Sequence, residues 1–174
     1  VGYTVSKGFF GTGVLNPMLT EGGYPESAYK LITQTAYPSW LYPVTQGATT
    51  IWERWNSYTH ENGFGGNNSM NSFNHYSLGS VLSWIYEAVL GIRRDENKPG
   101  YAHFTLAPQM MVLDYAKGGF ETGFGRIESS WEKTETGYAY ECTVPENTTA
   151  TLVLPDLKGG VSAEELVSGV YRFE

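Results

Sequence analysis

Hydrophobic residues follow two different periods along this chain of 174 residues, and the change of period limits the folds that it can adopt. In the upstream part apolar residues recur every three or four positions, as in a helix with one buried face. Beyond about residue 100 they alternate with polar residues, as in a strand with one buried face. The change coincides with the segment 95–100, Asp-Glu-Asn-Lys-Pro-Gly, which combines charge, proline and glycine. We therefore expect two domains, residues 1–98 and 99–174.

Three helices are expected in the upstream part, at about residues 10–18, 25–37 and 71–90. The second begins at Pro25, because proline is favoured at the first position of a helix, where its missing N–H would have no partner. The third is apolar nearly all round and is expected to end at Gly91, so it needs an environment that buries most of its surface. Three helices offer too few partners for that. The chain is therefore expected to be a fragment of a larger protein, with a homodimer through the exposed helix faces as the alternative.

Short strands are expected downstream. Six runs fit the alternating pattern, at residues 101–106, 111–118, 126–133, 138–144, 149–154 and 166–173. In the third run Ile127, Ser129 and Trp131 share one parity and the charges take the other, so one face of that strand is expected to be buried. Strands of this length and spacing are typical of an antiparallel β-sandwich. The expected fold class is therefore α plus β in two parts.

Composition excludes several classes of function. Eighteen acidic and eleven basic residues give a net charge of −7, whereas a protein that follows nucleic-acid phosphates or an anionic membrane needs a basic face. Cys142 is the only cysteine and the three histidines are scattered, so no disulfide, metal site or cofactor is expected. No apolar run approaches the roughly 20 residues of a membrane span. Aromatic residues reach 15% and charged residues only 17%, which suits extensive burial or stacking on sugar rings.

Glu53 is the acidic residue that stands out upstream, because it lies between Trp52 and Trp55. A carboxylate among indoles resembles the wall of a sugar-binding site, where a desolvated carboxyl group works as an acid or a base. The other interpretation pairs Glu53 with a nearby base at the edge of a hydrophobic cluster, and these residues alone favour it. His75 is the second candidate, either in a binding site or in the core as a hydrogen-bonded histidine of the third helix.

Several longer runs are shared with one enzyme family. They are Gly-Phe-Phe-Gly-Thr at 8–12, Tyr-Pro-Ser-Trp at 37–40, Gly-Ala-Thr-Thr-Ile-Trp-Glu-Arg-Trp at 47–55 and Met-Asn-Ser-Phe-Asn-His-Tyr at 70–76. Shorter runs follow at 91–93, 99–101, 107–108, 145–150 and 168–173. On these residues the chain resembles the bacterial α-L-rhamnosidases, and the resemblance covers nearly the whole chain in order.

The resemblance implies an inverting glycosidase whose catalytic (α/α)6 barrel is followed by a β-sandwich, with the last helices of the barrel in this chain. It implies that Glu53 is the general base and that His75 contacts bound rhamnose from glycosides or polysaccharides. Trp52 and Trp55 then either shape that site or pack behind Glu53. An inverting glycosidase also needs a general acid roughly 6.5 to 9.5 Å from the base. In the family this acid lies in the first half of the barrel, which nothing here matches, so the fragment alone is expected to be inactive.

Two alternatives remain open at this point. The first is another (α/α)6 enzyme, such as a glucoamylase-like hydrolase or a disaccharide phosphorylase. The second is a carbohydrate-binding module that stacks Trp131 or Tyr138 on a sugar, although a core position is favoured for Trp131. The bacterial cytoplasm or periplasm is expected as the location rather than a membrane.

Overall fold

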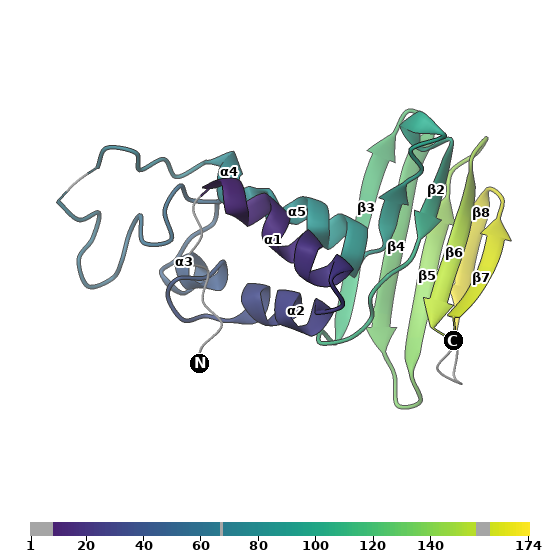
Figure 1. The fold of residues 1–174 in the computed structure, drawn as a ribbon, viewed down its shortest axis with the longest axis horizontal. Helices are drawn as coiled ribbons and strands as arrows, with labels where there is room; N and C mark the ends of the chain where they lie inside the picture. The colour runs from purple at the N-terminus through teal and green to yellow at the C-terminus, as the bar shows by residue number, and fades with distance from the viewer. Residues whose placement is uncertain (1–8, 67, 156–160) are drawn as a thin grey trace. The chain divides into compact units, whose positions relative to one another are not determined.

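The computed structural model describes residues 9–66, 68–155 and 161–174. The chain forms two compact units, residues 1–84 and 85–174 (Figure 1). The first unit holds helices and a long loop, and the second holds β-strands. This boundary lies upstream of the domain boundary expected at residue 98, which stays a prediction. The difference arises because residues 85–94 pack with the strands that follow them.

The first two helices, α1 (Phe9–Glu21) and α2 (Pro25–Thr33), are joined by a tight glycine turn. Gly23 has a φ of +84°, and the N–H of Tyr24 donates to the carbonyl of Leu19 at 2.7 Å. This is the hydrogen-bond pattern that ends many helices at a glycine, and it satisfies a carbonyl that the helix leaves free. Pro25 begins α2 as expected from the sequence. The turn therefore folds the two helices against each other, and they are in contact.

Aromatic and polar contacts fix the core of the first unit around Trp84, at the end of α5 (Val81–Trp84). The ring of Trp84 meets the buried ring of Tyr29 edge to face, with 5.3 Å between centroids. Its indole N–H donates to the hydroxyl of Thr20 at 2.7 Å. Buried Asn16 donates to the carbonyl of Ala28 at 3.3 Å. These contacts join α1, α2 and α5 in one small core.

The helix expected at 71–90 is wrong at its start. Residues 71–75 are not helical and bend at Phe73 and Asn74, and the helical path begins at α4 (Tyr76–Gly79), continues through α5 and ends in the π-helix η1 (Ile85–Val89). The polar groups of Ser72 explain the difference, because its hydroxyl accepts from the N–H of Asn74 at 3.2 Å and its N–H donates to a side chain in another segment. The helix expected at 25–37 also ends early, at Thr33, because Gln34 is extended. A short helix that the sequence does not indicate, α3 (Leu41–Thr45), follows.

Apolar side chains remain exposed on the helices of the first unit. Val14 and Met18, one turn apart on α1, are 53% and 68% exposed, and Leu82 of α5 is also exposed. The small core therefore covers only part of the apolar helical surface, as the sequence predicts. Among the described residues no helix has the length and hydropathy that a membrane span requires.

The second unit contains two four-stranded sheets. One sheet has the order β1 (Ile92–Arg94), β2 (His103–Leu106), β6 (Thr149–Pro155) and β7 (Val161–Leu166). The other has the order β3 (Tyr115–Thr122), β4 (Gly125–Lys133), β5 (Tyr138–Val144) and β8 (Gly169–Phe173). A short 3-10 helix, η2 (Pro99–Tyr101), lies between β1 and β2. All neighbouring strands pair antiparallel except β2 and β6, which pair parallel.

Alternate residues of these strands form the core of the sandwich, as the sequence predicts. Ile127, Ser129 and Trp131 of β4 are all buried. Trp131 is only 2% exposed, and its indole N–H donates to the carbonyl of Val89 at 2.8 Å. The hydroxyl of Ser129 donates to the carbonyl of Leu90 at 2.6 Å. The alternative in which Trp131 stacks on a sugar is therefore wrong, because neither face of its ring is free.

The sequence pattern does not predict two of the strands, and each omission has a physical reason. β1 has three residues, too few to establish an alternation. In β7 only Leu166 is buried, so this edge strand has no apolar face to recognise. In the other strands the sequence pattern specifies which residues form the core.

Cys142 is one of these core residues. Burial of its thiol raises its pKa to about 12 from the usual 9.0, mainly by desolvation.

Gly91 supplies a test of the packing in the second unit. Its φ is +74°, and a Cβ there would lie 2.2 Å from the backbone nitrogen of Pro108. We expect Gly91→Ala to lower the free energy of unfolding by at least about 2 kcal/mol, because a left-handed backbone disfavours an L side chain and the clash adds to that cost. Urea-dependent labelling of Cys142 measures this, since it is the chain's only cysteine and is buried in the sandwich.

Gly123→Ala is the matched control, since a Cβ there would meet no atom within 4 Å. Its effect is expected to stay within about 0.5 kcal/mol. Similar shifts of the labelling midpoint in both variants would show that the position of Gly91 is not constrained as described.

Candidate active site

Two segments of the first unit that lie far apart in sequence run side by side, residues 51–53 and 72–75. The N–H of Glu53 donates to the carbonyl of Ser72 at 2.9 Å, and the N–H of His75 donates to the carbonyl of Ile51 at 2.9 Å. Both segments belong to the long loop between α3 and α4, whose described residues form no helix. The two hydrogen bonds bring together the side chains of Glu53 and His75, the two residues that the sequence singles out.

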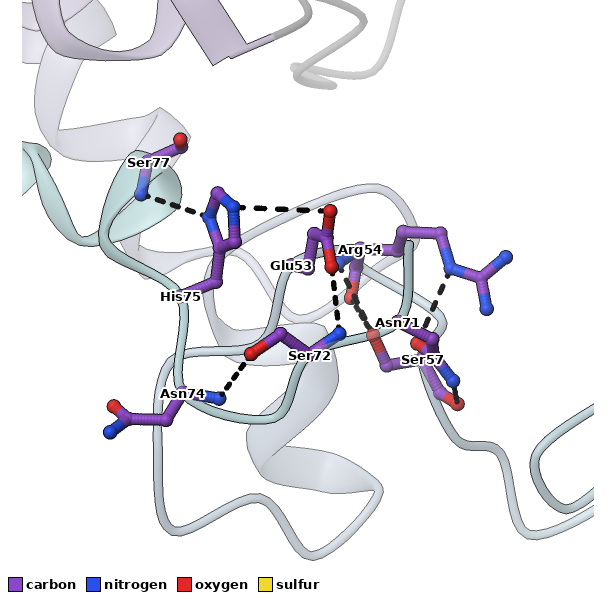
Figure 2. A network of polar contacts seen from close by, with 8 residues as sticks. All are labelled: Glu53, Arg54, Ser57, Asn71, Ser72, Asn74, His75 and Ser77. Carbon is purple, nitrogen blue, oxygen red and sulfur yellow. Dashed lines mark hydrogen bonds and ion pairs between the residues drawn. The ribbon is translucent and has the colours of Figure 1, made fainter. Parts of the chain in front are cut away.

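The Glu53 carboxylate is buried, with 8% of the residue exposed. Its Oε2 accepts a hydrogen bond from the N–H of Ser72 at 2.7 Å. Its Oε1 lies 3.9 Å from Nε2 of His75 (Figure 2). That separation is too long for a hydrogen bond but lies within ion-pair distance. One oxygen of the carboxylate is thus held by the backbone, and the other points to the histidine.

His75 occupies the N-cap position of α4 and not a face of the helix. Its backbone is extended, with φ −123° and ψ 130°, and its Nδ1 accepts a hydrogen bond from the N–H of Ser77 at 3.2 Å. In the neutral imidazole the acceptor nitrogen carries no proton, so the hydrogen resides on Nε2. Nε2 is the atom that faces Glu53. The cap therefore sets which nitrogen of His75 presents a donor to the site.

Arg54 is turned to the other side of the chain, away from His75 (Figure 2). Its Nε donates to Oδ1 of Asn71 at 3.3 Å, and Nδ2 of Asn71 donates to the carbonyl of Ser57 at 3.1 Å. The hydroxyl of Ser57 donates to the carbonyl of Arg54 at 3.1 Å. These bonds join the turn after Glu53 to the start of the segment that carries Ser72 and His75. The sequence pattern does not indicate this connection, because its partners lie up to 17 residues apart.

The indoles on either side of Glu53 have separate aromatic partners. Trp52 is 6% exposed and meets Phe73 edge to face at 5.3 Å. Trp55 is half-buried and meets Trp40 edge to face at 5.3 Å. The indole N–H of Trp40 donates to the carbonyl of Leu78 at 2.8 Å. The burial of Trp52 favours packing behind Glu53, and the assignment of Trp52 and Trp55 as substrate contacts stays a prediction.

The remaining histidines lie elsewhere. His103, on β2, has Nδ1 2.7 Å from the hydroxyl of Thr149 and Nε2 3.1 Å from the hydroxyl of Thr151. The side chain of His60 is exposed on the long loop of the first unit. Within the described part of the chain no three His, Cys, Asp or Glu side chains are grouped to hold a metal ion.

Comparison with known families assigns both parts of the chain. Residues 1–89 match the model of the bacterial α-L-rhamnosidase six-hairpin glycosidase domain, and residues 91–168 match that of the bacterial α-L-rhamnosidase C-terminal domain. The chain belongs to the bacterial α-L-rhamnosidases. The resemblance inferred from the shared runs is thereby confirmed, and so is the fold class, the last helices of a six-hairpin barrel followed by a β-sandwich.

Individual rhamnosidases are similar to this chain over most of its length. It is 44% identical over 150 residues to an α-L-rhamnosidase of Formosa agariphila and 42% identical over 149 residues to one of Alteromonas sp. strain LOR, in each case covering 85% of this chain and 16% of the relative. The crystal structure of the Streptomyces avermitilis α-L-rhamnosidase complexed with L-rhamnose superposes with a TM-score of 0.85 at 34% identity, covering 98% of this chain and 18% of that one. The rhamnosidase chain therefore spans about a sixth of the length of these relatives.

The hydrogen bond at the N-cap of α4 predicts the tautomer of His75. We expect the neutral ring to carry its proton on Nε2, because Nδ1 accepts from the N–H of Ser77. Nitrogen-15 NMR of the imidazole ring distinguishes the two tautomers directly. Ser77→Ala is the matched control, since it keeps the backbone N–H and is expected to leave the tautomer unchanged. A dominant Nδ1–H form in the unmodified chain would contradict the cap.

Proposed function

We propose that this chain is the C-terminal part of an inverting α-L-rhamnosidase that hydrolyses terminal α-L-rhamnosyl residues of glycosides or polysaccharides. The observation that carries the proposal is the Glu53 carboxylate, buried, held at Oε2 by the N–H of Ser72 and directed at Oε1 toward Nε2 of His75. A carboxylate with one oxygen fixed and the other available is suited to remove a proton from water. The relatives named above, which are α-L-rhamnosidases, support the choice of substrate.

In this proposal Glu53 acts as the general base. A water molecule attacks the anomeric carbon of rhamnose from the face opposite the leaving group, and Oε1 of Glu53 takes its proton as the new C–O bond forms. The bond to the leaving oxygen breaks at the same time, and a second carboxylic acid gives that oxygen a proton. Inverting enzymes keep their two carboxyl groups roughly 6.5 to 9.5 Å apart so that the water fits between base and sugar.

His75 acts in this scheme as a substrate contact. Its Nε2–H is the donor that faces the site, so we assign it a hydrogen bond to a hydroxyl of rhamnose. Trp55 is half-buried and supplies a wall, whereas Trp52 packs against Phe73 behind the carboxylate. The buried surroundings of Glu53 limit competition from bulk water for Oε1.

The rest of the enzyme supplies the general acid and covers the exposed helices in this proposal. This chain corresponds to 16% of the relatives' length, so most of their six-hairpin domain has no counterpart in it. We assign the exposed face of α1, with Val14 and Met18, to contact with further helical hairpins. A homodimer through this face stays a prediction.

Replacement of the base tests the assignment in the longer protein that contains this chain. Glu53→Gln is expected to lower the rate of hydrolysis of an aryl α-L-rhamnoside by about 10²- to 10⁴-fold, the usual contribution of a general base. Proton NMR of the reaction measures the rate and also the first anomer released, for which inversion predicts β-L-rhamnose.

Glu26→Gln serves as the matched control, because Glu26 lies exposed in the first turn of α2 and outside the site. It is expected to hydrolyse the rhamnoside at the rate of the unmodified enzyme. An active Glu53→Gln enzyme would remove Glu53 from the role of base, and α-L-rhamnose as the first product would exclude inversion.

The 174-residue chain by itself is expected to hydrolyse aryl α-L-rhamnosides at no measurable rate. Removal of a proton by Glu53 is half of the proton transfer that hydrolysis needs, and the leaving oxygen needs an acid as well. A colorimetric assay of the purified chain, next to the longer protein at equal molar concentration, measures this. Turnover by the short chain that disappears in its Glu53→Gln variant would mean that the chain holds its own acid.

A further inference from the structure

A concave site lies in the first unit, apart from the Glu53 and His75 pair. It is a cleft of about 430 Å³ between α3 with its flanking residues and the turn at 59–62. Three rings line it, those of Tyr37, Tyr42 and His60. Its volume falls in the range of roughly 300 to 1,000 Å³ that small-molecule sites occupy. Neither Glu53 nor His75 contributes to its lining.

Hydrogen bonds hold the two walls of the cleft together. Oε1 of Gln46, at the end of α3, accepts from the N–H of His60 in the opposite wall at 2.9 Å. Within that wall Thr59 and Gly63 exchange two backbone hydrogen bonds, of 2.8 and 3.0 Å. On the other side the rings of Tyr37 and Tyr42 meet edge to face at 5.2 Å. Hydrogen bonds therefore hold the walls of the cleft in place before a ligand binds. This lowers the conformational entropy that is lost on binding.

The chemistry of the lining fits a neutral sugar. The amides of Gln46, Asn56 and Asn62 each offer donors and an acceptor, as the adjacent hydroxyls of a sugar require. The phenol rings offer flat surfaces for the C–H faces of a pyranose. Glu61 is the charged side chain of the lining, which contains neither lysine nor arginine, so phosphates and carboxylates find no counter-charge there.

The cleft also lies close to the candidate base along the chain. Asn56 follows Glu53 by three residues, so their Cα atoms are at most about 11 Å apart even in a fully extended chain. The turn after Glu53 shortens this distance, because the N–H of Ser57 donates to the carbonyl of Arg54 at 3.2 Å. One wall of the cleft is thus a direct continuation of the segment that carries the carboxylate.

We propose that this cleft is a carbohydrate subsite that binds a neutral sugar unit of the leaving part of the substrate. The assignment to the leaving part rests on the proposed function, whereas the binding of a neutral sugar does not. The cleft then selects among rhamnosides by the leaving group that carries the rhamnose. Glu53 and His75 act on the rhamnose itself.

NMR titration of the 174-residue chain with methyl β-D-glucopyranoside tests the subsite without any need for hydrolysis. Shifts are expected at the side-chain amides of Asn56 and Asn62. Tyr42→Ala is expected to weaken binding about fivefold, through loss of one aromatic contact. Asn62→Ala is the second variant, because the turn uses the backbone N–H of Asn62 and not its side chain. Glucuronate, the charged analogue, is expected to bind more weakly beside Glu61.

Two controls separate this inference from the proposed function. Tyr24→Ala removes an exposed tyrosine of the same unit outside the cleft and is expected to leave the titration unchanged. Glu53→Gln is also expected to leave the titration unchanged, although it is expected to slow hydrolysis by about 10²- to 10⁴-fold in the longer protein. Shifts confined to Glu53 and His75, or unchanged affinity in Tyr42→Ala and Asn62→Ala, would overturn the subsite and leave the proposed function standing. Binding at the cleft together with an active Glu53→Gln enzyme would support the subsite and overturn Glu53 as the base of the proposed function.

Discussion

Two reciprocal hydrogen bonds between Glu53 and Ser72 hold the candidate site together. The N–H of Glu53 donates to the carbonyl of Ser72, and the N–H of Ser72 donates to the Glu53 carboxylate. This pairing holds the carboxylate within the long loop between α3 and α4, and the bond from the N–H of His75 to the carbonyl of Ile51 joins the same two segments. The same pairing sets the register that brings His75 opposite Oε1. The position of the Glu53 carboxylate therefore depends on backbone groups of a segment 19 residues away.

The site is in turn connected to the helical core through His75. Its ring caps α4, which contacts α1 as α5 does, and α5 ends at the buried Trp84. The Trp84 indole donates to Thr20 of α1 and packs on Tyr29 of α2. A long loop is thus fixed at its end by a helix N-terminus, and the helix is fixed by an aromatic core. This is how a functional residue on a loop acquires the precision of the scaffold that supports it.

Local rules predict some of these features and miss others for an identifiable reason. The parity of Ile127, Ser129 and Trp131 follows from strand geometry alone, and so does the burial of all three. The start of the last helix at Tyr76, and not near residue 71, depends on a contact between Ser72 and Glu53 that no window of neighbouring residues contains. The family resemblance implies a separate role for each of Glu53 and His75, but their 3.9 Å separation depends on that long-range pairing.

The N-cap of α4 has a consequence for the path of protons. Because Nδ1 of His75 accepts from the N–H of Ser77 and Nε2 carries the ring hydrogen, the neutral ring has no free nitrogen at which to take up a proton. The histidine is therefore a fixed donor and not a relay, unlike a histidine between a nucleophile and a buried acid. Under the proposed role of Glu53, a proton that its carboxylate gains leaves from the carboxylate itself and not through His75.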